Sequence, residues 1–145
     1  MATMNEILSR KGGMVHTIQS GATVLEAIRK MNDARIGALV VSDGDRVVGM
    51  FTERDVLRRV VEHERPPVQI AVAEVMTRSP LCVSPSTRIE EAARIMRDER
   101  IRHLPVVDGM DRLVGMVSIG DVNAHTAREQ EAALKSLEEY VYTSI

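Results

Sequence analysis

Apolar and polar residues follow a pattern along this chain that occurs twice. In each copy a short apolar run precedes a segment whose apolar residues recur at every third or fourth position, and two further apolar runs follow, separated by Asp-Gly. Spacing of three and four residues predicts a helix that buries one stripe, and Asp-Gly between apolar runs predicts a β-hairpin. A second helix is expected to begin at Thr52 and at Ser118. The predicted order is therefore β-α-β-β-α, present twice.

The predicted elements occupy matching positions in the two copies. The opening strands are expected over 15–18 and 81–83, and the hairpins pair 38–41 with 47–51 and 103–107 with 113–117. The buried stripes of the two first helices are expected at Val24, Ala27, Ile28 and Met31, and at Ile89, Ala92, Ala93 and Met96.

The two copies descend from an internal duplication. Laying residues 24–44 on 89–109 gives 11 identities in 21 positions, where about one or two would be expected by chance. A single unit of about 60 residues would bury only about 60% of its chain surface, so the two units are expected to share one core. The expected division is an N-terminal segment with the first repeat over 1–64, a linker with the second repeat over 65–125, and a C-terminal amphipathic helix over 126–145.

Local signals place the ends of several helices. Thr23 with Glu26, and Thr87 with Glu90, have the spacing of a capping box, in which a hydroxyl and a carboxylate satisfy unpaired helix N–H groups. Two consecutive prolines cannot continue a helix, so the second helix of the first copy is expected to end by 63–67. Residues 68–78 are predicted to form a short connecting helix.

The C-terminal segment has an amphipathic pattern. Apolar residues recur at three- and four-residue spacing, at Ala133, Leu134, Leu137 and Val141. Glu131 and Lys135 form an i,i+4 pair of opposite charge. The segment is therefore predicted to be a helix whose apolar face needs a partner surface.

Composition narrows the class of protein. The 145-residue chain has 44% hydrophobic and 28% charged residues, which is typical of a soluble globular domain. It has no apolar run near the ~20 residues that span a bilayer and no secretory apolar segment, so a cytoplasmic protein without membrane contact is expected. A net charge of −2 and only three aromatic residues argue against nucleic-acid binding. The single Cys82, in a short apolar run, is predicted to be a buried small hydrophobic residue rather than a reactive thiol.

Signatures of catalysis are missing from the sequence. It contains no Gly-x-Gly-x-x-Gly, no P-loop and no Gly-x-Ser-x-Gly. The four histidines fall at no metal-ligand spacing, so no metal site is expected. Paired acids flank the two hairpin turns, and there Asp is favoured by hydrogen bonds to the local backbone; the pairs are Asp43 with Asp45, and Asp108 with Asp111. The chain is therefore not expected to be an enzyme.

A hydroxyl and a carboxylate recur at the end of each hairpin, as Thr52-x-x-Asp55 and Ser118-x-x-Asp121. One interpretation is a helix cap, in which the hydroxyl and the acid satisfy the first helix amides. The other is a ligand site, because a carboxylate at a strand-to-helix edge can accept both hydroxyls of a ribose while the hydroxyl and the amides face a phosphate.

These motifs, with the string 101–108 and the segments 49–55 and 115–121, resemble a tandem pair of CBS domains, also called a Bateman module. The resemblance covers about residues 12–125. It implies an α+β fold in which two β-α-β-β-α repeats pack as one pseudo-twofold module. It also implies clefts between the repeats that bind AMP, ADP, ATP or S-adenosylmethionine, and less often NAD or cyclic dinucleotides. The ribose-binding acids then fall on Asp55 and Asp121, and the hydroxyls on Thr52 and Ser118.

The same resemblance implies that the two clefts are unequal. Basic residues that face phosphates in the family fall on Arg102 and His103, and both would serve the cleft of Asp55. His103 is expected to titrate near neutrality, so that affinity falls above about pH 6.5. Further cationic help for that cleft is expected from Arg54 and Lys11. The cleft of Asp121 meets Gly37 and Ala38 instead, and has Gly120 in place of Arg54.

Adenine recognition is expected to use backbone groups and apolar walls. The expected lining residues are Ile36, Gly37, Ala38, Met50 and His16. Ordinary core packing is the alternative for each of them, and it is the favoured one for Met50, whose counterpart Met116 is identical.

Two functions remain open at this point. The first is a regulatory module that senses an adenosine nucleotide and signals to an unidentified protein partner, assembled as a homodimer through its helices. The second is a structural or dimerisation module without physiological ligand binding. A nucleotide that binds the folded chain would raise its melting temperature, which separates the two.

Overall fold

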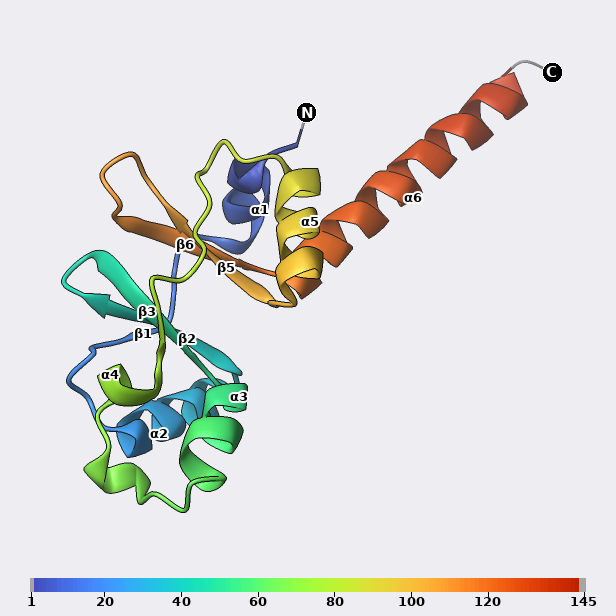
Figure 1. Cartoon of the computed structure of the whole chain (residues 1–145). Helices are drawn as coiled ribbons and strands as arrows, with labels where there is room; N and C mark the ends of the chain where they lie inside the picture. Colours follow the sequence, from blue (N-terminus) through green and yellow to red (C-terminus); the bar gives the residue numbers. More distant parts are fainter. Residues whose placement is uncertain (1, 144–145) are drawn as a thin grey trace.

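The computed structural model describes residues 2–143 and shows four layers, with two small sheets face to face and helices on the outer side of each (Figure 1). The predicted α+β class and the repeated β-α-β-β-α order are confirmed, apart from the first strand of the second copy. In chain order the elements are α1 (Met4–Lys11), β1 (Thr17–Ile18), α2 (Val24–Ala34), β2 (Ala38–Asp43), β3 (Arg46–Thr52), α3 (Glu53–Asp55), η1 (Val56–Val61), η2 (Pro67–Gln69), α4 (Val72–Val75), β4 (Thr77–Arg78), α5 (Ile89–Glu99), β5 (His103–Val107), β6 (Leu113–Ser118) and α6 (Ile119–Thr143).

The two sheets differ in size. The first has the order β1-β2-β3-β4, with β1 parallel to β2 and the other pairs antiparallel, whereas the second contains only the antiparallel pair β5-β6. The strand expected over 81–83 is reduced to a single parallel bridge between Val83 and Val106. Cys82 is consequently exposed, not buried as predicted. Partial desolvation and the charge of Asp111 raise the pKa of its thiol, so it is not an activated nucleophile.

The helices α2 and α5 bury the predicted stripes. Each spans 11 residues, and the fully covered positions are Val24, Ala27 and Met31 in α2 and Ile89, Ala92 and Met96 in α5. The capping box of Thr23 and Glu26 forms as predicted. The second predicted box is wrong, because Arg88 occupies the N-cap of α5 and the Thr87 hydroxyl accepts from the Ser84 amide at 3.0 Å instead.

The short helices α1 and α4 have equivalent roles in the two halves. Helix α4 packs against the core of the first repeat, while Met4 and Ile7 of α1 are buried in the core of the second. The first residue of each helix makes a corresponding hydrogen bond to the body of its repeat. The Val72 amide donates to the carbonyl of Ala22 at 2.8 Å, and the Met4 amide donates to the carbonyl of Thr87 at 2.9 Å. The N-terminal segment, expected alongside the first repeat, therefore completes the second one.

Glycine in the middle of each second hairpin strand allows this packing. A Cβ atom at Gly49 would lie 2.5 Å from the sulfur of Met76, and one at Gly115 would lie 2.5 Å from a methyl group of Leu8. At Gly49 the backbone carbonyl of Thr77 also lies only 2.8 Å away, so a side chain there would displace the main chain. At Gly115 the near atoms belong to the flexible side chain of Leu8, which could move aside.

A small apolar cluster joins the two sheets. Ala38, Val40 and Met50 of the first sheet are buried there, and Leu113 and Met116 of the second pack against them. At the edge of the sheets the Leu113 amide donates to the carbonyl of Asp45 at 2.9 Å. The repeats therefore form one module, but each has its own core and the small cluster joins the two, in place of the single shared core expected from the size argument.

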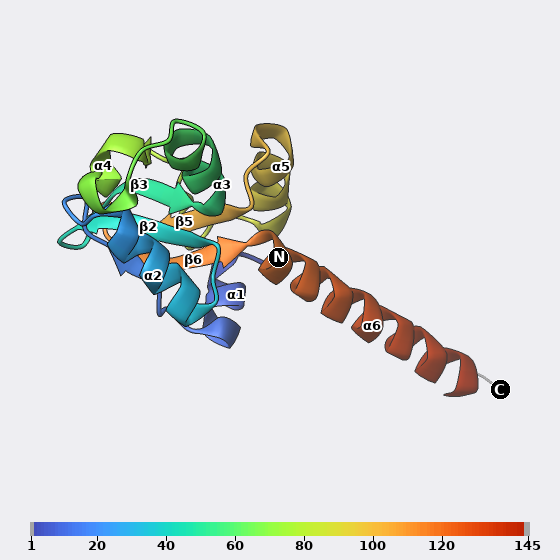
Figure 2. The same ribbon diagram turned by 90° about the horizontal axis from the view of Figure 1, so that it is seen from below.

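The second helices of the two repeats differ in length. In the first repeat α3 continues into a π-helical segment, η1, which ends before the prolines as predicted. In the second repeat no break occurs near residue 125, and α6 runs for 25 residues. Only its first part packs on the body, through Val122 and His125. The remainder projects away from the module in both views (Figures 1 and 2).

Candidate functional site

A cleft of about 830 Å³ lies between the two repeats, beside the end of β3. The first repeat contributes its strand-to-helix turn and η1, and the second contributes the segment before β5. The chain that connects them, from β4 onward, forms a further wall. The lining residues are Gly37, Met50, Thr52, Glu53, Arg54, Asp55, Leu57, Arg58, Arg59, Thr77, Ser79, Pro80, Leu81, Glu99, Arg100, Ile101, Arg102 and His103.

Asp55 is the buried acid of this cleft, with a relative exposure of 7%. Its Oδ2 accepts from the amide of Thr52 at 2.9 Å and from the Thr52 hydroxyl at 3.3 Å, and its Oδ1 lies 3.7 Å from Nε of Arg59. The carboxylate thus caps the helix, as the simpler interpretation predicted. A carboxylate offers about four acceptor positions, so this cap leaves acceptor capacity for a ligand.

Arginines dominate the charge around the cleft. Five of them line it against three carboxylates, those of Glu53, Asp55 and Glu99; the arginines are Arg54, Arg58, Arg59, Arg100 and Arg102. Three stand on the first repeat and two on the second, so the positive charge faces the cleft from both sides. Arg59 is fixed in place because its guanidinium donates to the carbonyls of Val75 and Met76, both at 3.0 Å. Such a ring favours a ligand with more than one negative charge.

His103 lines the same cleft but does not add a charge at neutral pH. Burial, followed by the nearby charges of Arg102 and Lys11, lowers its pKa below the ordinary 6.5, and this outweighs the opposite effects of Asp121 and Glu53. The expectation that His103 titrates near neutrality is therefore corrected. A neutral imidazole can still donate one hydrogen bond.

Seven of the predicted site residues meet in this cleft: Gly37, Met50, Thr52, Arg54, Asp55, Arg102 and His103. The structure does not bring the other four there. Ile36 packs on the core of the first repeat and Ala38 is buried between the sheets. The carbonyl of His16 accepts from β2, and Lys11 lies at Asp121 in the second repeat.

Sequence reasoning missed the wall formed by Thr77, Ser79, Pro80 and Leu81, and the arginines at 58, 59 and 100. The Arg100 position had a detectable signal, because Arg35 and Arg100 match in the duplication and both end their helix in a left-handed conformation, with φ of 56° and 55°. No sequence pattern indicated the wall formed by residues 77–81, because its position depends on where the chain leaves α4.

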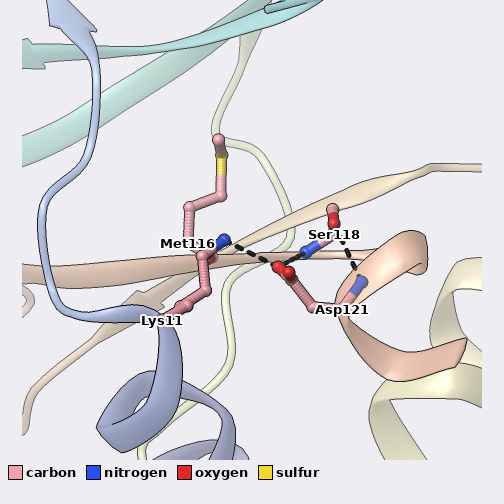
Figure 3. A network of polar contacts seen from close by, with 4 residues as sticks. All are labelled: Lys11, Met116, Ser118 and Asp121. Carbon is pink, nitrogen blue, oxygen red and sulfur yellow. Dashed lines mark hydrogen bonds and ion pairs between the residues drawn. The ribbon is translucent and has the colours of Figure 1, made fainter. Parts of the chain in front are cut away.

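The second Ser/Thr-x-x-Asp motif forms a different site (Figure 3). Ser118 and Asp121 make a reciprocal capping box, with bonds of 2.8 Å from the Ser118 amide and 3.1 Å from the Asp121 amide. Nζ of Lys11 lies 2.6 Å from Oδ2 of Asp121 and also donates to the carbonyl of Met116 at 2.9 Å. Desolvation would raise the pKa of Asp121, but the bonds from Lys11 and Ser118 hold it below the ordinary value.

Other parts of the surface offer less. A shallower hollow of about 450 Å³ is lined by Arg59, His63, Arg65 and Glu74. Both of its arginines already have partners, because Arg59 donates to two main-chain carbonyls and Arg65 forms an ion pair with Glu74 at 3.1 Å.

Within residues 2–143, no group of three or more His, Cys, Asp or Glu side chains is placed to hold a metal ion. In the same range no helix is both long and apolar enough to cross a membrane. Asp108 serves its turn as predicted, accepting from the amides of Met110 and Arg112, whereas Asp43 accepts from the amide and hydroxyl of the distant Ser20 and not from its own turn.

Comparison with known proteins agrees with this architecture. The model of the CBS domain matches residues 6–62 and again 72–126. The mitochondrial CBS domain-containing protein CBSX3 of Arabidopsis thaliana is 32% identical over 148 residues, covering 96% of this chain and 71% of that protein. Some relatives are much longer, and the match spans only 18% of the Arabidopsis protein CBSCBSPB2.

Two solved structures extend the comparison to the fold. A protein with CBS domains from Burkholderia ambifaria MC40-6 is 39% identical with a TM-score of 0.83, covering 89% of this chain and 96% of that one. The CBS domain protein PAE2072 from Pyrobaculum aerophilum, which is complexed with AMP, is 27% identical with a TM-score of 0.73, covering 83% and 89%.

The lowered pKa of His103 predicts a pH effect on stability. Between that pKa and about 6.5 the unfolded chain binds a proton that the folded chain does not, so stability falls as the pH drops through this window. A His103→Gln variant should show a smaller difference in unfolding free energy between about pH 7.5 and about pH 5.5 in urea denaturation. The exposed His63 is the matched control, and His63→Gln should keep the wild-type difference. An unchanged difference in His103→Gln would refute the assignment.

Proposed function

The chain belongs to the CBS domain family, and we propose that it is a regulatory module that senses a phosphorylated adenosine ligand in the cleft of Asp55. The observation that carries this proposal is the combination, in one cleft of about 830 Å³, of a buried carboxylate with five arginines. The carboxylate suits the two hydroxyls of a ribose, and the arginines suit phosphate oxygens. The complex of PAE2072 with AMP supports this ligand class.

The ligand would act by drawing the two repeats together. Arg54 and Arg58 stand on the first repeat, Arg100 and Arg102 on the second, and all four line one cleft. A phosphate between them reduces the mutual repulsion of these arginines only when both sides are close. Such a ligand has a higher affinity for the closed arrangement and shifts the equilibrium toward it. The changed surface would then be presented to a protein target.

The alternative is a structural module that has kept the fold without binding a ligand. One observation favours it, namely that Asp55 and Asp121 already satisfy amides of their own helices. The excess of five arginines over three carboxylates at the first cleft is the argument against it, because a purely structural role does not require that excess. No catalytic role is proposed. A cytoplasmic location stays a prediction, and the relative CBSX3 is named as mitochondrial.

Asp55 should be required for nucleotide binding. Replacing it with Ala is expected to weaken AMP binding by several-fold to about a hundredfold, corresponding to about 1–3 kcal/mol for lost charge-assisted hydrogen bonds. Isothermal titration calorimetry measures this directly, with ADP, ATP, S-adenosylmethionine and NAD as competing candidates. Because Asp55 also caps a helix, Asp55→Asn and the melting curve of each variant serve to separate binding from folding. The exposed Asp33 of α2 supplies the control, Asp33→Ala. Equal affinity in folded Asp55→Ala and wild type would exclude the site.

Arg102 should act on the phosphate and not on the nucleoside. Without its guanidinium the ligand loses one charged partner, so Arg102→Ala should lower AMP affinity about tenfold, while adenosine binding changes little. Calorimetry with both ligands gives the ratio. Arg94→Ala on α5, outside the cleft lining, is the control. Equal losses for AMP and adenosine would contradict the assignment of Arg102 to the phosphate.

The projecting part of α6 should pair with a second copy of the chain. Leu134 and Leu137 are 58% and 59% exposed, and with Val141 they repeat at the three- and four-residue spacing of a two-helix seam. Light scattering should give twice the mass of the 16.1 kDa chain. Leu137→Asp should weaken the dimer at least about tenfold, because each buried leucine contributes about 1.5–3 kcal/mol. Ser136→Asp, beside the seam, should leave the dimer intact, and a monomeric wild type would refute the pairing.

A further inference from the structure

The side chain of Lys11 ends at the acid that corresponds to Asp55 in the second repeat. Its ammonium contacts Oδ2 of Asp121 at 2.6 Å and the carbonyl of Met116 at 2.9 Å (Figure 3). The two bonds link the last residue of α1 to the end of β6 and the first turn of α6. Both partners are partly buried, with side-chain exposures of 35% for Lys11 and 24% for Asp121, so solvent screens this pair only in part.

The first repeat has a different arrangement at the matching place. There the chain leaves α4 after Val75 and forms β4, in which Thr77 lies opposite Met50. In the second repeat α1 stays helical through Lys11, and the lysine side chain reaches the carbonyl of Met116, the counterpart of Met50. A strand lines the first cleft, and a cation occupies the equivalent region of the second.

An ammonium at Asp121 competes with the ligand group that this acid would otherwise hold. Displacing it would leave a partly buried carboxylate without its counter-charge and the Met116 carbonyl without a donor. The hydroxyls of a ribose are neutral donors and form weaker bonds with a carboxylate than an ammonium does. By sequence, Gly120 corresponds to Arg54 and Gly37 to Arg102, while Arg35 corresponds to Arg100, so two of these three arginine positions have no cationic side chain at the second acid.

We propose that Lys11 closes the second cleft to nucleosides by occupying the ribose position on Asp121, so that each chain binds one nucleotide. This inference rests on the proposed function, in that it takes Asp55 and Asp121 as equivalent ribose-binding acids. It assigns to Lys11 a role in specificity, and it moves this residue from the first cleft, where sequence reasoning had placed it, to the second. The unequal clefts predicted from the sequence thereby acquire a cause in a side-chain contact.

Adenosine titrations can test the role of Lys11 separately from the first cleft. The starting protein is the Asp55→Ala variant, which removes the first acid, and the probe is adenosine because a phosphate would itself be attracted by the ammonium of Lys11. Adding Lys11→Ala should increase adenosine affinity at least about tenfold. Adding Asp121→Ala as a third change should abolish the gain. Lys135→Ala, which removes an exposed lysine of α6, is the control for net charge and should produce no gain.

The outcomes separate the two proposals. A gain in adenosine affinity that depends on Asp121 supports the block by Lys11. Lys11→Met keeps the aliphatic part of the side chain and removes only the charge, so it should produce the same gain. Absence of a gain in both folded variants overturns the block. If wild type binds AMP through Asp55 while the Lys11 variants show no gain, only this inference fails. If AMP does not bind wild type at all, the proposed function fails, and an Asp121-dependent gain would still support the block.

Discussion

Each half of the module depends on a short helix from outside the repeat, α4 or α1, whose side chains pack beside a glycine in a β-strand. Met76 meets Gly49 in the first repeat, and Leu8 meets Gly115 in the second. Each contact completes a core with a segment from outside the repeat, namely the linker that follows the first repeat and the N-terminal helix in the case of the second, so neither core is finished by its own repeat alone. Each contact also fixes where the chain goes next. After Met76 it forms the wall of the first cleft, and after Leu8 it brings Lys11 to Asp121.

The duplicated acids show how the same local structure can have different chemistry. Both carboxylates accept from an amide three residues earlier, Asp55 at 2.9 Å and Asp121 at 2.8 Å. Their cationic neighbours differ, since Arg59 stands 3.7 Å from Asp55 while Lys11 stands 2.6 Å from Asp121. Arg59 is held by two main-chain carbonyls and so cannot close fully on its acid. Among the described residues, Asp55 thus has no cation within hydrogen-bond distance, whereas an ammonium donates to Oδ2 of Asp121.

The sequence was sufficient for those features that depend on short-range patterns. The helix stripes, the hairpins and the equivalence of Asp55 and Asp121 all follow from periodicity and from the duplication. The second capping box failed because Thr87 has the right spacing to Glu90 but not the right place in the repeat, where Arg88 aligns with the N-cap Thr23. The contact of Lys11 with Asp121 spans 110 residues, and no local pattern encodes it. It could be found only after α1 was placed on the second core.

An asymmetric module suits a switch better than a symmetric one would. To convert an equilibrium of 1:99 into 99:1, a ligand must favour one state by about 5.5 kcal/mol. Such a difference requires contacts that the ligand makes in only one of the two states. Charged groups on opposite walls of a cleft can provide these contacts, because the distance between each group and a bound phosphate changes when the walls move. Arg58 and Arg100 are placed in this way on the two sides of the first cleft. The second repeat instead links α1 to α6 through the ion pair of Lys11 with Asp121. In the proposed function only the ligand of the first cleft then contacts charged groups on both repeats, so the free energy of binding that favours the closed arrangement comes from that cleft alone.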